Sequence, residues 1–182
     1  ESDGPDFSLP PFLVSVVRDM EQVTAAEVVE ILLAGPNSEE EAAGISSAVP
    51  EVTVLGVAIS DGVASVDLDR SFEAGGGTLM MGSRLAQLTW TLTGLEEVDS
   101  VSLLLNGTVV ETFSGEGIIL DGPMVRDDFV DLLPGILVEQ PAWGAPVAPN
   151  FTIRGTAAVF EAVFVYTVSQ NGSLLVDETP AM

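Results

Sequence analysis

The segment from Phe12 to Val110 constrains the fold most, because β-rich runs and helix-period repeats alternate along it in a definite order. A capping box, Thr24-Ala-Ala-Glu27, predicts the start of one helix, since hydroxyl and carboxylate can satisfy free amides there. Gly35-Pro36 predicts its end. We expect this helix to run to about Ala34 and to turn three residues inward, namely Val28, Ile31 and Leu32.

Asp61-Gly62 lies between the β-rich runs 52–60 and 63–68 and predicts a type I′ hairpin, because both central positions of that turn need positive φ. Residues 37–41, before this hairpin, are predicted to form an acidic loop. After Gly75-Gly76-Gly77 we expect a second helix with Thr78 as N-cap and Gly94 in the left-handed C′ position. Its inward stripe is Met81, Leu85, Leu88 and Leu92.

The predicted element order of this first region is β-α-β-β-α-β with a closing hairpin. Its first strand is the buried run 12–17, and its last is 101–105, which turns at Asn106-Gly107 into 108–110. The predicted fold class is α+β, with two helices on one face of a small, mainly antiparallel sheet. The region is expected to contain a complete hydrophobic core, so that a chain shortened at about residue 112 would still fold.

The remaining chain is divided by its composition. Residues 1–11 form an acidic, proline-containing tether, residues 12–112 the α+β domain, and residues 113–134 a connector broken by Gly115, Gly117 and Gly122-Pro123. Residues 135–182 are predicted to be all-β, with short strands at 136–140, 141–147, 151–157 and 159–176.

Charge and missing side chains exclude several classes of function. The chain has 28 acidic and 5 basic residues, and its net charge of −23 opposes binding to nucleic acid. It contains no Cys, His or Lys, which excludes disulfides, Ser–His and Cys–His catalysis, and imidazole or thiolate metal sites. The chain has no run of about 18 or more apolar residues, so its sequence predicts no transmembrane helix.

Carboxylates, the single Tyr166 and hydroxyls are the groups that remain for catalysis, and the arrangement of the carboxylates indicates no site. Asp67, Asp69 and Glu73 lack the glycine and further ligands of a calcium loop. The acidic clusters 39–41, 96–97 and 127–128 offer no apolar pocket to raise a carboxyl pKa for glycoside hydrolysis. We therefore predict no catalytic residue, no metal ligand and no cofactor.

Four residues are candidates for interaction: Arg84, Trp90, Arg126 and Trp143. In so acidic a chain, an Arg can form a bidentate pair with a carboxylate, and we expect Arg84 and Arg126 to pair within the chain. Trp90 lies off the apolar stripe of its helix, and Trp143 lies in a turn, so packing at an edge of the core is expected of both.

Four segments, taken together, carry a family resemblance: EVVEILLAGP (27–36), GISSAVP (44–50), VTVLGVAISDGVASVDLDRSF (52–72) and LAQLTWTLTGLEEVDSVSLLLNG (85–107). Their order and spacing resemble the GerMN domain of bacterial spore-germination and cell-envelope lipoproteins. The resemblance implies a ring-building α+β fold and a non-enzymatic, extracytoplasmic protein, lipid-anchored or secreted. It also implies assembly with other envelope proteins and contact with peptidoglycan. Membrane association is then expected only through a lipid anchor that this chain does not contain.

Residues 135–182 resemble the immunoglobulin-like domain that follows GerMN, through a proline-glycine turn, an RGTA segment, a VFEA element and an Asn-Gly hairpin. They are fewer than the roughly 100 residues of a full sandwich, so we expect an incomplete domain with exposed apolar surface, which either self-associates through that surface or is poorly ordered. For the function of the whole chain, the alternatives to assembly with envelope proteins are a peptidoglycan- or sugar-binding module and a carboxylate-based wall hydrolase.

Overall fold

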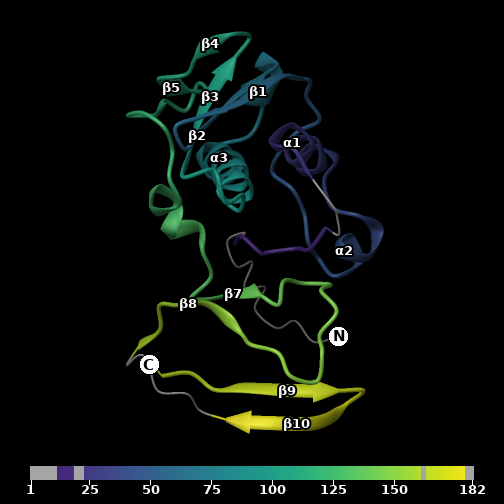
Figure 1. Cartoon of the computed structure of the whole chain (residues 1–182). Helices are drawn as coiled ribbons and strands as arrows, with labels where there is room; N and C mark the ends of the chain where they lie inside the picture. Colours follow the sequence, from purple (N-terminus) through teal and green to yellow (C-terminus); the bar gives the residue numbers. More distant parts are fainter. Residues whose placement is uncertain (1–11, 19–22, 161–162, 179–182) are drawn as a thin grey trace, which may run out of the picture. The chain divides into compact units, whose positions relative to one another are not determined.

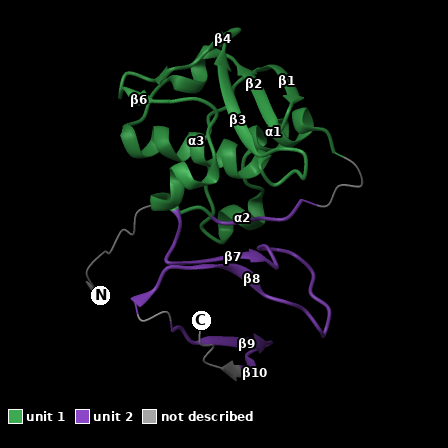
Figure 2. Cartoon of the chain, turned by 60° about the vertical axis from the view of Figure 1, so that its left-hand side comes forward, with its two compact units in different colours: residues 1–13, 19–132 green, residues 14–18, 133–182 purple. Residues whose placement is uncertain are grey.

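The structure is a computed structural model that describes residues 12–18, 23–160 and 163–178. The chain forms two compact units: residues 1–13 with 19–132, and residues 14–18 with 133–182 (Figure 2). The first unit is α+β and the second is all-β, which confirms the predicted fold class.

The first helix, α1, spans Ala25–Ala34 and has the predicted capping box. The backbone N–H of Glu27 donates to Thr24 Oγ1 (3.3 Å), and the backbone N–H and hydroxyl of Thr24 both donate to Glu27 Oε2 (2.8 Å each). Gly35, at φ +73°, ends the helix as predicted. The inner face is rotated from our prediction, because Ala25 and Val29 are buried while Val28 and Leu32 are half-buried against the core.

Residues 37–41 do not form the predicted loop, because Ser38–Ala42 is a short helix, α2. Asn37 is its N-cap, and Asn37 Oδ1 accepts from the backbone N–H groups of Glu39 (2.9 Å) and Glu40 (3.0 Å). Glu40 Oε2 accepts from the Asn37 N–H (2.8 Å), and the Glu40 side chain is buried. The signal that we missed is an Asn-x-x-Glu capping box.

Four strands form the sheet of the first unit, in the order β1-β2-β3-β4: Val54–Ser60, Val63–Leu68, Ser100–Leu105 and Thr108–Val109. β1 and β2 pair antiparallel, β2 and β3 parallel, and β3 and β4 antiparallel. Both predicted hairpin turns are confirmed, since Asp61 and Gly62 have φ of 52° and 78°, and Asn106 and Gly107 have φ of 51° and 78°.

A 3-10 turn, η1 (Arg70–Glu73), leads from β2 toward the long helix α3 (Thr78–Leu92). The predicted stripe is confirmed, because Met81, Leu85, Leu88 and Leu92 are all buried. Both predicted caps are wrong. Gly77 is the N-cap, and Thr78 is the first helical residue. Gly94 does not have the positive φ of a left-handed C′ residue.

The core lies between the sheet and the helices α1 and α3 (Figure 1). Alternate residues of β2 and β3 point into it in matched register: Ala64 beside Val101, Val66 beside Leu103, and Leu68 beside Leu105. Period-two alternation therefore gives the sheet one apolar face, which the two helices cover.

The predicted buried strand at 12–17 is not present. Phe12 and Val14 are exposed, and this segment makes only a single parallel bridge, between Val16 and Trp143 of the second unit. A short apolar run has no periodicity that separates a strand from an extended connection, which is why the pattern misled us.

The predicted connector 113–134 is packed onto the first unit over most of its length. It contains the strand pair β5 (Thr112–Phe113) and β6 (Ile118–Ile119) and the 3-10 segment η2 (Arg126–Leu132). Phe113 packs on Phe72, with ring centroids 5.6 Å apart, and Met124 and Phe129 are buried in the same core. The glycines mark turns within a packed segment. The domain boundaries proposed from the sequence stay predictions.

The second unit contains two antiparallel strand pairs: β7 (Ile136–Gln140) with β8 (Arg154–Ala157), and β9 (Tyr166–Gln170) with β10 (Ser173–Glu178). Asn171-Gly172 forms the predicted hairpin turn with positive φ at both residues. Residues 141–147 form no strand, and β9 begins later than predicted. Large apolar side chains are exposed on this unit, including Phe160, Val165, Leu174 and Leu175.

Candidate functional site

Arg84 lies inside the first unit and is 6% exposed. Its Nε donates to Ala48 O (2.9 Å), and its Nη1 donates to Phe72 O (2.7 Å) and Ala74 O (2.9 Å). Burial lowers the pKa of the guanidinium from its ordinary value. We expected a carboxylate partner; the structure gives backbone carbonyls instead. Arg84 thus ties α3 to the turn around η1 and to the segment before β1.

Arg126 and Trp90 lie together at the end of α3. The Arg126 guanidinium carbon is 4.4 Å from the centroid of the Trp90 ring, and Arg126 Nε donates to Thr93 Oγ1 (2.8 Å). Thr93 in turn donates to Thr89 O (2.7 Å). This cation–π contact holds the start of η2 against α3. The Trp90 indole Nε1 is buried and has no hydrogen-bond partner among the described residues.

Trp143 belongs to the second unit and is 39% exposed. Its backbone N–H donates to Ser15 O (2.9 Å), and its carbonyl accepts from the Val17 N–H (3.2 Å). The backbone of Trp143 therefore anchors residues 14–18, whereas its side chain remains partly accessible to solvent. Of the three candidate residues in the first unit, only Trp90 and Arg126 are brought together.

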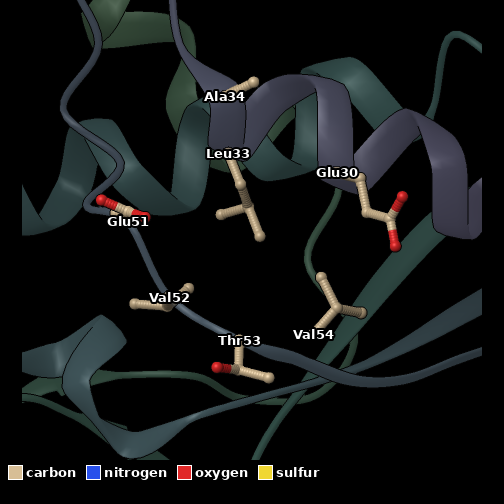
Figure 3. Close-up of a pocket in the computed structure, with 7 residues that line it drawn as sticks. All are labelled: Glu30, Leu33, Ala34, Glu51, Val52, Thr53 and Val54. Atoms are coloured by element: carbon tan, nitrogen blue, oxygen red, sulfur yellow. The ribbon is translucent and has the colours of Figure 1, made fainter.

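The first unit also contains a groove that our sequence reasoning did not find. It lies between the last turn of α1 and the segment that leads into β1, and its volume is about 620 Å³. Leu33 projects from α1 into this space, and Glu30 and Glu51 lie toward opposite ends of it (Figure 3). The full lining is Glu30, Leu33, Ala34, Glu51, Val52, Thr53 and Val54.

The floor of this α1–β1 groove is formed by three apolar side chains, within a lining that is overall as polar as it is apolar. Leu33, Val52 and Val54 are half-buried and pack against the core of the first unit. Each of them still keeps part of its surface in the groove, where it remains accessible to solvent. Partly covered apolar side chains in a concave site are typical of ligand and peptide binding sites.

The rim of the α1–β1 groove is negative. Glu30 and Glu51 are both exposed, and neither side chain makes a hydrogen bond or ion pair within the described chain. The last turn of α1 contains no basic residue, so the negative end of the helix dipole is uncompensated there. Glu30, which directly precedes that turn, adds like charge. The local field therefore favours a cation.

The cations of the first unit are engaged elsewhere. Arg84 donates to carbonyls inside the core, Arg126 stacks on Trp90, and Arg70 pairs with Glu73 (3.5 Å). Arg18 and Arg154, which belong to the second unit, complete the five basic side chains of the sequence. No basic side chain of the first unit thus lines the groove.

Three of the other carboxylates that we considered from the sequence accept hydrogen bonds from nearby backbone groups. Asp67 Oδ1 accepts from the Gly107 N–H (2.9 Å), and Asp128 Oδ2 accepts from the Val125 N–H (2.9 Å). Asp69 Oδ1 accepts from the Ser71 N–H (2.7 Å), which lowers the Asp69 pKa. No group of three or more acidic residues that could hold a metal ion occurs in the described ranges.

Comparison with known proteins gives two family matches for this chain. The family model Germane, described as sporulation and spore germination, matches residues 8–111. A second family model, Gmad2, described as an immunoglobulin-like domain of bacterial spore germination, matches residues 135–182. The comparison with curated proteins gave no match.

Solved structures show the same fold at low sequence identity. The tandem GerMN domains of the sporulation protein GerM from Bacillus subtilis match at 19% identity and TM-score 0.55, covering 92% of this chain and 55% of theirs. The first GerMN domain of that protein matches at 22% and 0.50, covering 60% and 84%. A candidate lipoprotein from Clostridium perfringens matches at 17% and 0.51, covering 60% and 72%. At these identities the likeness concerns the fold alone.

No described helix has both the length and the apolar character that crossing a lipid bilayer requires. The two family matches together cover most of the chain, and the first alone covers more than half of it. The chain therefore belongs to the Germane family of sporulation and spore germination, with a Gmad2 immunoglobulin-like domain after the Germane domain.

Proposed function

We propose that this protein works outside the cytoplasm, in the bacterial cell envelope, and that it acts without catalysis by assembling with other envelope proteins. The match of residues 8–111 to a sporulation and germination family carries the proposal. The fold shared with a candidate lipoprotein from Clostridium perfringens supports the envelope location.

Uncovered apolar side chains on each unit support a role in protein contacts. In the first unit they form the floor of the α1–β1 groove. In the second unit a larger set is exposed: Val147, Phe151, Ile153, Phe160, Val163, Val165, Leu174 and Leu175. Exposed apolar side chains that gather into one patch are characteristic of sites that bind another protein. The second unit is also where we propose self-association.

The arrangement of polar groups supports a non-catalytic role. The buried Arg84 and the stacked Arg126 hold segments of the first unit together, so their charges serve the fold. Glycoside hydrolysis would need two carboxyls with opposed pKa shifts facing one cleft. Glu27 and Asp69 have lowered pKa values, both through hydrogen bonds from nearby backbone and side-chain groups. Neither of these two carboxyls therefore has the raised pKa that a general acid needs.

The test combines capture with a turnover assay. The intact chain, immobilised, is exposed to a detergent-solubilised envelope fraction of the native bacterium, with an unrelated folded protein of similar negative charge as control. We expect specific retention of one or a few envelope proteins, and no release of reducing sugar from purified peptidoglycan. Sugar release that is lost on changing an acidic pair, or binding to purified wall with no protein retained, would contradict the proposal.

A further inference from the structure

We propose that the α1–β1 groove binds an extended segment of a partner protein that carries Arg or Lys side chains among apolar ones. The inference rests on the proposed function, because it names the chemistry of the partner. It begins from two facts about the groove, an apolar floor and a rim with two unpaired carboxylates.

Charge complementarity selects a cationic occupant. Glu30, Glu51 and the carbonyl end of α1 all place negative potential at one site. No basic residue of the last α1 turn offsets them, and the Arg residues of the first unit are engaged elsewhere. A positive charge bound at this groove would therefore come from outside this unit.

The apolar floor selects long side chains over a bare metal ion. Leu33, Val52 and Val54 offer no oxygen ligand from their side chains, whereas calcium takes six to eight oxygen ligands. Arg and Lys fit both features, because their aliphatic stems pack on apolar surface while their charged heads reach carboxylates at the rim. Apolar neighbours in the same segment would cover the rest of the floor.

The sheet topology favours an extended conformation for this segment. β1 is an edge strand, paired with β2 alone within the described sheet, and the groove leads directly into it. A register shift between Val54 and Gly56 leaves Leu55 half-exposed at the point where β1 begins. A strand edge with unpaired backbone groups and a nearby pocket for side chains is a common mode of peptide recognition.

The probe is a short blocked peptide of alternating Arg and Val, titrated into the intact chain and followed by backbone amide shifts in NMR spectra. We expect the shifts to concentrate in residues 30–34 and 51–55. Peptides of alternating Glu and Val, or Arg and Gly, should bind more weakly, because one lacks the positive charge and the other lacks the apolar side chains.

Two double variants separate the groove from the general acidity of the chain. Glu30→Gln with Glu51→Gln, and Glu96→Gln with Glu97→Gln, change the net charge equally, and Glu96 and Glu97 are exposed away from the groove lining. The first should weaken the Arg–Val peptide by about tenfold or more, as expected for loss of two charge pairs, and the second by less than about twofold. Equal weakening by both would overturn the inference.

Ala34→Lys is a further variant that removes no carboxylate. Ala34 is exposed and lines the groove, so a Lys there would supply the missing cation within the chain. We expect weaker peptide binding than in a matched Ala34→Gln variant. Unchanged binding in Ala34→Lys, or shifts of residues 30–34 and 51–55 with calcium chloride and none with the peptide, would refute the proposed occupant.

Failure of this inference is distinguishable from failure of the proposed function. If envelope proteins are retained equally by the wild type and the Glu30→Gln, Glu51→Gln variant, the partner binds elsewhere and only the groove assignment is wrong. If the peptide binds specifically while no envelope protein is retained, the assembly function is wrong and the groove chemistry stands.

Discussion

Replacing Arg84 with Met should destabilise the first unit strongly, because a buried guanidinium bridges three backbone carbonyls. These are Ala48 O at 2.9 Å, Phe72 O at 2.7 Å and Ala74 O at 2.9 Å. Met keeps a stem of similar bulk, so the change removes the donors while preserving much of the packing. Phe72 O is the most severely affected acceptor, since its hydrogen bond is fully buried.

The expected loss is about 3–5 kcal/mol. A hydrogen bond to a charged group contributes about 1.5–3 kcal/mol, so three additive bonds would contribute about 4.5–9 kcal/mol, most of which lies above the expected loss. Two of the three bonds are only partly buried, so water can replace the donor there. Removing a buried charge also relieves its desolvation cost, the same effect that lowers the Arg84 pKa.

Urea unfolding followed by fluorescence measures this loss. Trp90 belongs to the first unit and Trp143 to the second, so a Trp143→Phe background isolates the signal. With a urea dependence of about 2 kcal/mol per molar, the midpoint should fall by about 2 M. Arg70→Met is the control, because Arg70 is exposed and its pair with Glu73 should contribute under about 1 kcal/mol.

Ionic strength distinguishes the two readings of Arg84. Because its partners are carbonyls in the interior, the difference between wild type and Arg84→Met should be the same in low and high salt. A difference of less than about 1 kcal/mol would refute the structural role of these bonds. A loss that shrinks markedly as salt is added would indicate the carboxylate partner that the sequence first led us to expect.

Three further predictions concern the core, the helix cap and the extent of the first unit. Leu88→Asp, at a buried position of α3, should cost at least several kcal/mol, and an unchanged melting temperature would contradict the placement of that helix. Glu27 has a lowered folded-state pKa, through hydrogen bonds from the Thr24 backbone and hydroxyl. The stability it adds should be present at neutral pH and lost as the pH falls through that pKa, so the difference between wild type and Glu27→Gln should shrink in acid; a difference that grows would invert the sign. A fragment of residues 12–132 should unfold cooperatively, whereas one of residues 12–112 should not, because it lacks the buried Phe113, Met124 and Phe129. Equal cooperativity of the two fragments in calorimetry would show that those side chains are dispensable.

The sequence predicted best where a local pattern has a single physical solution. The Thr24–Glu27 box and the two hairpin turns, Asp61-Gly62 and Asn106-Gly107, are confirmed because each satisfies backbone groups within a few residues. The α3 stripe is confirmed because helical period leaves few alternatives over fifteen residues.

Prediction failed where the outcome depends on distant partners. The run 12–17 has no local feature that places it beside Trp143. The glycines of 113–132 suggest loops and give no sign that Phe113 and Met124 are buried, because that burial follows from tertiary packing. The prediction of a left-handed Gly94 cap failed because the C-cap of α3, Thr93, has a φ of −72° and no left-handed residue follows.

The candidate site was the hardest part to predict. Glu30 and Glu51 are far apart in sequence, and their nearness to one groove follows only from the packing of α1 against the start of β1. One local signal was available: the last turn of the predicted helix has no basic residue, and Glu30 directly precedes that turn. Arg84 carried no such signal, since its carbonyl partners come from two segments that lie apart from it in sequence, Ala48 and the turn of Phe72 and Ala74.

Site-specific photocrosslinking in the native bacterium tests assembly through protein contacts most directly. A photoreactive residue is introduced at Thr53, which is exposed in the groove lining, and at Thr108, exposed in β4, as a matched control. We predict a protein adduct from position 53, in which the captured peptide contains Arg or Lys among apolar residues, and none of that adduct from position 108. Adducts with peptidoglycan fragments in place of protein, or no adduct from either position, would contradict the account.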